Sequence, residues 1–171
     1  LGESLTRTVN TLEENNLPTL FSMVLFFFAA GASGLMSKSF NGPYKNHWAC
    51  LGALFVLCAI DETACFHEQL SFAIQQSLGL QGALFYSWIF PAAVLVSVLA
   101  VLYVPVVAKL PARARLKILG GGVLFVTGAV GFEPIQGWIV SNGYYFQIER
   151  LAITLASVEE ILELAGLILF I

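Results

Sequence analysis

The last 21 residues of the chain constrain its fold more than any other stretch. Residues 151–171 read LAITLASVEEILELAGLILFI, and their only charged side chains are those of Glu159, Glu160 and Glu163. A helix of this length crosses a bilayer core of ~30 Å. Each carboxylate near the centre of such a helix costs roughly 2.5–3.5 kcal/mol on insertion scales. Helical spacing places the three acids on one broad face, and we expect that face to point away from lipid.

The composition extends this prediction to the whole chain. Of its 171 residues, 58% are hydrophobic and only 11% are charged, against about 25% charged residues in soluble domains. The sequence therefore predicts an all-α integral membrane bundle of about five transmembrane helices in a single transmembrane domain. The predicted spans are residues 17–36, 47–66, 80–110, 116–140 and 151–171.

The basic residues predict how this bundle is oriented. Five spans place successive loops on alternate sides of the membrane. Loops one and three hold six Lys and Arg residues, whereas the opposite side holds only Arg7 and Arg150. Because cytoplasmic loops carry an excess of Lys and Arg, we expect loops one and three in the cytoplasm and the N-terminus outside. The expected location is a bacterial-type inner membrane or an energy-converting membrane.

The acids form a band in this topology. Eight of the eleven acids fall between the outer interface and the bilayer centre, namely Asp61, Glu62, Glu68, Glu133, Glu149, Glu159, Glu160 and Glu163. Asp61 and Glu68 lie on one face of the second span, and Glu62 and His67 point to either side of them. We expect this face to meet the acidic face of the last span.

A divalent metal is one way to satisfy these acids. Buried like charges must share protons, pair with a cation or bind metal, and Arg150 is the only nearby cation on that side. Carboxylates with one imidazole suit Fe, Mn or Zn. The predicted ligands are Asp61, Glu62, His67, Glu68, Glu159, Glu160 and Glu163. Their spacing differs from the Glu-x-x-His pairs of di-iron bundles. The prediction therefore rests on the need for a positive charge to compensate the carboxylates, and not on a known ligand motif.

Other interpretations also account for acids within the predicted membrane spans. Protonated acids could hydrogen-bond between helices as a structural polar core, or they could form a proton or cation path. The apolar surface also fits a non-catalytic accessory subunit of a larger energy-converting complex. The expected partners are the lipid bilayer and, in that reading, other membrane subunits. The sequence holds no glycine-rich phosphate loop, Ser-His-Asp pattern or basic patch, so we expect no nucleotide cofactor and no nucleic acid.

Two short patterns resemble a known group. The pattern DE-x4-HE occupies residues 61–68, and EE-x2-E occupies residues 159–163. They resemble a group of uncharacterised bacterial polytopic membrane proteins in which similar acidic pairs recur. Ala59 and Ile60 precede Asp61 here, where that group has a serine. The resemblance covers spans two to five and implies no activity.

Overall fold

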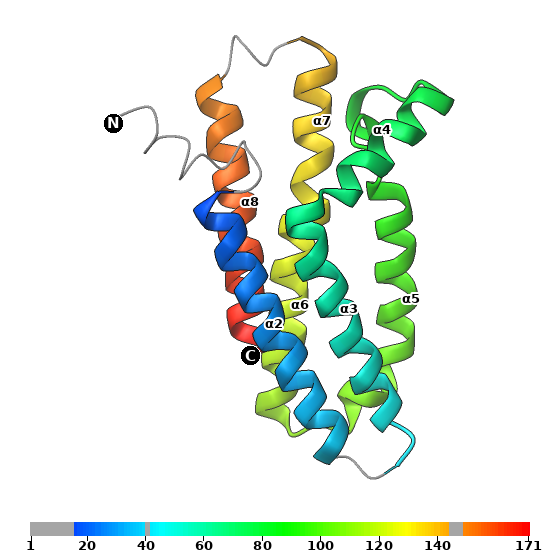
Figure 1. Cartoon of the computed structure of the whole chain (residues 1–171), viewed down its shortest axis with the longest axis vertical. Helices are drawn as coiled ribbons and strands as arrows, with labels where there is room; N and C mark the ends of the chain where they lie inside the picture. Colours follow the sequence, from blue (N-terminus) through cyan, green and yellow to red (C-terminus); the bar gives the residue numbers. More distant parts are fainter. Residues whose placement is uncertain (1–15, 40–41, 144–148) are drawn as a thin grey trace.

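The chain folds into helices throughout its described parts. The computed structural model describes residues 16–39, 42–143 and 149–171, and all regular structure in these ranges is helical, as predicted (Figure 1). The elements are α2 (Leu17–Ser39), α3 (Lys45–Ala64), α4 (Phe66–Leu78), the 3-10 turn η1 (Gly82–Leu84), α5 (Ile89–Ala108), α6 (Ala112–Val126), the π-helical turn η2 (Thr127–Phe132), α7 (Glu133–Ser141) and α8 (Glu149–Phe170).

Four helices in the described ranges are long and apolar enough to cross a membrane. They are Leu17–Ser39, Lys45–Ala64, Ile89–Ala108 and Ala112–Ser141, the last comprising α6, η2 and α7 in one 30-residue helix. Helix α8 has the length of a span, with 22 residues, but Glu159, Glu160 and Glu163 put three charged residues in the part that would cross the bilayer. The fifth span therefore stays a prediction.

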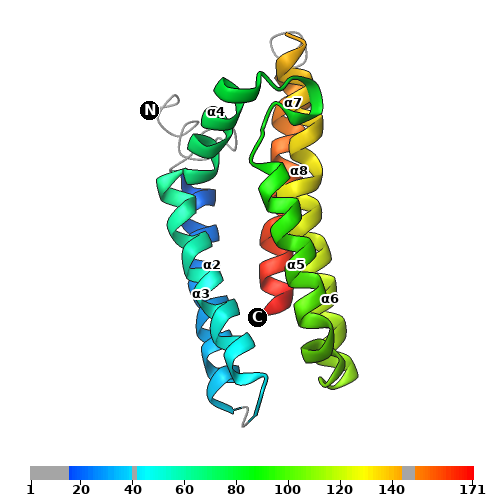
Figure 2. The same ribbon diagram turned by 90° about the vertical axis from the view of Figure 1, so that its right-hand side faces the viewer.

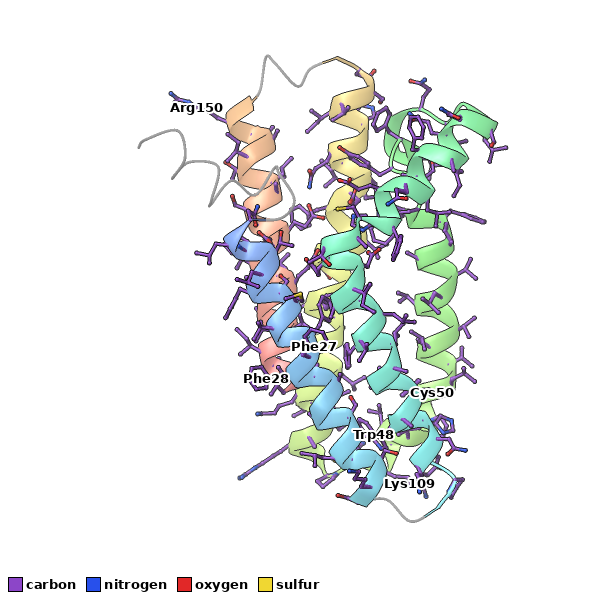
Figure 3. All side chains as sticks on the ribbon, in the orientation of Figure 1. Phe27, Phe28, Trp48, Cys50, Lys109 and Arg150 are labelled. Carbon is purple, nitrogen blue, oxygen red and sulfur yellow. The ribbon has the colours of Figure 1, made fainter. Side chains whose placement is uncertain are left out.

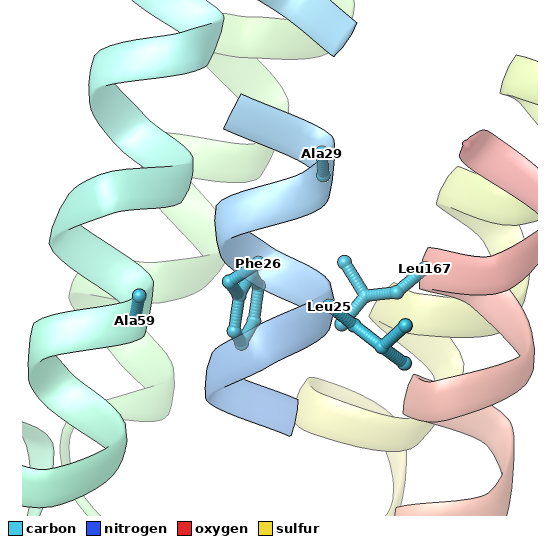
Figure 4. Close-up of a cluster of buried hydrophobic side chains, with 5 residues drawn as sticks. All are labelled: Leu25, Phe26, Ala29, Ala59 and Leu167. Carbon is cyan, nitrogen blue, oxygen red and sulfur yellow. The ribbon is translucent and has the colours of Figure 1, made fainter. Parts of the chain in front are cut away.

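The helices form two layers. Helices α2 and α3 lie side by side in one layer, and α5, α6, α7 and α8 make up the other (Figure 2). Small residues let α2 and α3 approach closely, because a Cβ on Gly52 would lie 3.2 Å from the carbonyl oxygen of Ala30. A buried cluster then ties both helices to α8 (Figure 4). It contains Leu25, Phe26, Ala29, Ala59 and Leu167.

Helices α6 and α8 approach even more closely. A Cβ on Gly121 would lie 2.7 Å from the carbonyl oxygen of Gly166, and a Cβ on Gly166 would lie 2.7 Å from that of Gly121. Both glycines are buried. Close backbone approach through small residues is a common way for membrane helices to associate. It holds the acidic helix α8 directly against α6.

The connections between helices agree with the predicted alternation. The α2–α3 and α5–α6 connections lie at the same end of the bundle, and Lys109 marks this end in Figure 3. Arg150 lies at the opposite end. We refer below to these as the basic end and the acidic end.

All five predicted spans differ from the observed helices at one or both ends, and two of these differences have a clear local cause. Helix α3 ends at Ala64 rather than residue 66, because Cys65 adopts a left-handed conformation with φ of 51°. The chain then turns into α4, a 13-residue helix. The third span begins at Ile89 rather than residue 80, since Gly79 and Gly82, with φ of 61° and 65°, interrupt the chain before it.

Candidate functional site: an acid-lined cavity

A large cavity lies between the two layers. Its volume is about 1350 Å³, and residues of α2 to α8 line it. Every acidic side chain that the structure describes contributes to this lining. These are Asp61, Glu62, Glu68, Glu133, Glu159, Glu160 and Glu163, and His67 lies among them. The side chain of Glu149, the eighth acid of the predicted band, lies outside the described residues.

The cavity is polar at one end and apolar along most of its length. The acids come from the end of α3, the start of α4, the start of α7 and the middle of α8. Towards the basic end the lining becomes apolar, with residues such as Leu54, Leu99 and Ile118. Within the described ranges, Arg115 is the only Lys or Arg in the lining. It precedes Glu133 by 18 residues on the same long helix, a rise of ~27 Å.

The break between α3 and α4 places Asp61 against His67. The Asp61 carboxylate accepts a hydrogen bond from the His67 backbone N–H at 3.1 Å, and its other oxygen lies 2.7 Å from His67 Nδ1. Asp61 thus caps the first turn of α4, where backbone N–H groups lack helical partners. Because a carboxylate only accepts hydrogen bonds, Nδ1 carries the donating proton, and this orients the ring.

Trp88 links this pair to the opposite layer. Its indole ring packs against the His67 ring with centroids 5.2 Å apart, and its Nε1–H donates to Glu133 Oε1 at 3.4 Å. The Trp88 backbone N–H donates to the hydroxyl of Ser71 on α4 at 3.1 Å. These contacts join α4 and α7 to the start of α5 at the acidic end of the cavity.

The acids of α8 face the same space from the other side. Gln136 on α7 donates a side-chain hydrogen bond to Glu159 Oε2. Glu163 lies close enough to Glu159, Glu62 and Glu133 for their charges to interact. The π-helical turn brings α6 onto α8 here, because a Cβ on Gly128 would lie only 2.7 Å from Glu163 Cγ. The carboxylates of three helices therefore share one electrostatic environment.

The π-helical turn itself follows from the Glu133–Pro134 sequence. Pro134 has no backbone N–H, so it cannot bond to the carbonyl of Val130 one turn earlier. The residues immediately before Glu133, Thr127–Phe132, adopt π-helical geometry. Insertions of this kind are frequent at functional sites. The turn aims Glu133 at the cavity.

The structure places all seven predicted ligands in the lining of one cavity. Helices α3 and α8 contact each other through Phe55 and Phe170, whose ring centroids lie 4.9 Å apart, and the acidic faces of both helices line the cavity. Among the described residues, no group of three or more His, Cys, Asp and Glu side chains has an arrangement that could hold a metal ion. The metal site stays a prediction.

Sequence reasoning missed two residues of this site. Gln136 is three residues after Glu133, a helical spacing that puts both on one face, and this signal could have found it. Trp88 carries no comparable signal. It reaches the site only because the chain folds back after α4.

The fold and the cavity define a small helical protein with four potential transmembrane helices and an acidic interior. The chain belongs to the family described as "Domain of unknown function (DUF8692)", which matches residues 2–171. Comparisons with curated proteins and with solved structures gave no match.

Proposed function

We propose that this protein binds a cation at the acidic end of its cavity. The observation that carries the proposal is the convergence of every described acid on one cavity whose only Lys or Arg, within the described ranges, lies at the far end. Carboxylates crowded in a low-dielectric space repel one another, and a bound cation relieves that repulsion. The cation best suited to carboxylates with one imidazole is a divalent metal ion such as Fe, Mn or Zn.

The Asp61–His67 pair supports this choice. Histidines that bind metals through one ring nitrogen usually donate the other N–H to a carboxylate, which fixes the ring. His67 has this arrangement, with Nδ1 2.7 Å from Asp61. In the proposal, Asp61 orients His67, whose Nε2 joins the glutamates as a ligand. The glutamates are spread around the cavity, so metal binding draws their long side chains inward.

Metal content tests this function directly. Protein purified in detergent without chelator should contain at least one transition-metal ion per chain, measured by elemental analysis. Chelation should remove the ion and change the thermal midpoint, because a ligand that binds only the folded state stabilises it. Wild-type protein without bound metal, whose midpoint does not respond to chelator or to added Fe²⁺, Mn²⁺ or Zn²⁺, would contradict the proposal.

A second candidate function is that of an accessory subunit in a larger, energy-converting membrane complex. The exposed apolar faces favour it, including Phe27 and Phe28 on α2 at 49% and 61% exposure (Figure 3). Such faces fit contact with another subunit as well as contact with lipid. Mild-detergent purification from native membranes should then yield stoichiometric partner subunits. Isolation of the chain alone would exclude this candidate.

We also infer the orientation of the protein in its membrane. The basic end holds Lys109 together with Arg113, Arg115 and Lys117 of α6. By the positive-inside rule we assign this end to the cytoplasm of a bacterial-type inner membrane or an energy-converting membrane. A reporter fused near Arg113 should read cytoplasmic, and one fused at the N-terminus should read external. The reverse pair of readings would overturn this orientation and the outer position of the acids.

A further inference from the structure

The apolar part of the cavity points to the kind of molecule that enters it. We propose that the cavity binds an amphiphile with one protonated amine head and one long apolar chain. The head lies among the acids, and the chain lies along α5 towards the basic end. This inference rests on the proposed function in one respect, the preference of the acidic end for a cation.

The shape of the cavity suits a chain. Residues that line it on α5 extend from Ala92 to Ala108, a helical rise of ~24 Å. The lining between them is apolar and includes Leu95 and Leu99. An unfilled apolar space loses the dispersion contacts that a well-packed interior makes. A flexible hydrocarbon chain restores these contacts.

Contacts between the layers cross the cavity near both of its ends. At the basic end, the Tyr103 hydroxyl on α5 donates to the His47 carbonyl on α3 at 2.6 Å. Trp48, Val106 and Leu110 form a buried cluster beside it. At the acidic end, α4 bonds to Trp88, as described above. Between these contacts, the space between α3 and α5 lets a ligand lie along the helix axes.

The cavity is larger than a compact ligand needs. Its volume is about 1350 Å³, whereas pockets for compact small molecules measure ~300–1,000 Å³. A long, narrow amphiphile uses this extended space.

The charges decide which head group fits. Seven carboxyl groups line the acidic end, and the guanidinium of Arg115 lies at the other end, where it donates to the Leu110 carbonyl at 3.2 Å. An anionic head among the acids would be repelled, and a neutral head would leave their charge uncompensated. An ammonium group instead makes charge-assisted hydrogen bonds to carboxylates.

Chain-matched probes test this inference. Protein in micelles of a sugar-headed non-ionic detergent would be titrated with dodecylamine, dodecanol and sodium dodecyl sulfate, and bound probe counted by native mass spectrometry. One dodecylamine should bind per chain, at least ~10-fold more tightly than dodecanol, because only the amine makes charge-assisted bonds. Excess Mn²⁺ should displace the amine. Equal binding of amine and alcohol would overturn the inference.

Two neighbouring alanines on α5 provide a matched pair of variants. Ala92 lines the cavity, whereas its neighbour Ala93 is exposed and does not. Ala92→Phe should fill the space and weaken dodecylamine binding at least ~10-fold by overpacking, whereas Ala93→Phe should leave it unchanged. Equal affinities in the two variants would place the probe elsewhere and overturn the inference.

The outcomes separate this inference from the proposed function. Protein that contains no metal but binds dodecylamine in an Ala92-dependent way would reject the metal and retain the amphiphile. Protein that binds metal but shows no preference for the amine over the alcohol would retain the metal and reject the amphiphile.

Discussion

Gly166→Leu should separate α6 from α8 and destabilise the bundle. A Cβ at this position would lie 2.6 Å from the Phe125 backbone nitrogen and 2.7 Å from the Gly121 carbonyl oxygen. Both are backbone atoms, so no side-chain rotation relieves the clash. Overpacking a buried site costs ~1–3 kcal/mol and occasionally more, and this site lies at the extreme of that range.

The matched control is Gly31→Leu. Gly31 is exposed on α2, and a Cβ there would meet nothing within 4 Å. The same substitution at Gly31 should be neutral or slightly stabilising, since glycine is a poor helix former. Thermal midpoints in detergent would compare the variants, and we expect Gly166→Leu to fall by ~6–12 °C or to aggregate. Equal midpoints for the two variants would mean that α6 and α8 do not pack through Gly166.

Glu163→Gln should abolish most metal binding while making the metal-free protein more stable. Glu163 lies among Glu159, Glu62, Glu160 and Glu133, close enough for charge on any of them to repel charge on the others. Glutamine keeps the shape of the side chain but removes its charge. The metal therefore loses a ligand, and the remaining carboxylates repel one another less. Metal stoichiometry and the chelated thermal midpoint measure the two effects separately.

Two further variants sharpen this experiment. Thr63→Val is the control, because Thr63 is exposed beside the site and its hydroxyl bonds only to the Ile60 carbonyl of its own helix. It should retain full metal content. Glu163→Leu removes hydrogen bonding as well as charge. If the acids are neutral structural groups, Glu163→Gln should hardly change the free energy of unfolding. Glu163→Leu should lower it by ~1–3 kcal/mol. That pattern, without metal in the wild type, would leave a structural polar core as the explanation.

Local features of the sequence determined the helices. The apolar runs behind α2, α3 and the long helix Ala112–Ser141 are properties of neighbouring residues, and the structure has helices at these positions. The spacing of Glu159, Glu160 and Glu163 likewise places them on one helical face whatever the rest of the chain does. Their cost in lipid led to the prediction that they face the interior, and the structure places them in the cavity.

Helix ends and the layout of the cavity depended on tertiary structure. Cys65 ends α3 in a left-handed conformation that cysteine seldom adopts, and Asp61 bonding to His67 stabilises the turn that follows. Trp88 reaches Glu133 across 45 residues of chain. No local pattern encodes such a contact.

How closely the helices approach was also decided only by the folded molecule. Gly128 brings η2 onto α8, and Gly166 brings α8 onto α6, whereas α3 and α5 stay apart around the cavity. Many glycines look alike in the sequence, and Gly31 and Gly34 on α2 meet nothing within 4 Å. Whether a glycine marks a contact depends on which helix lies opposite it. That is set by the packing of all the helices together, and so the sequence predicted the acids of the site but not the cavity that they line.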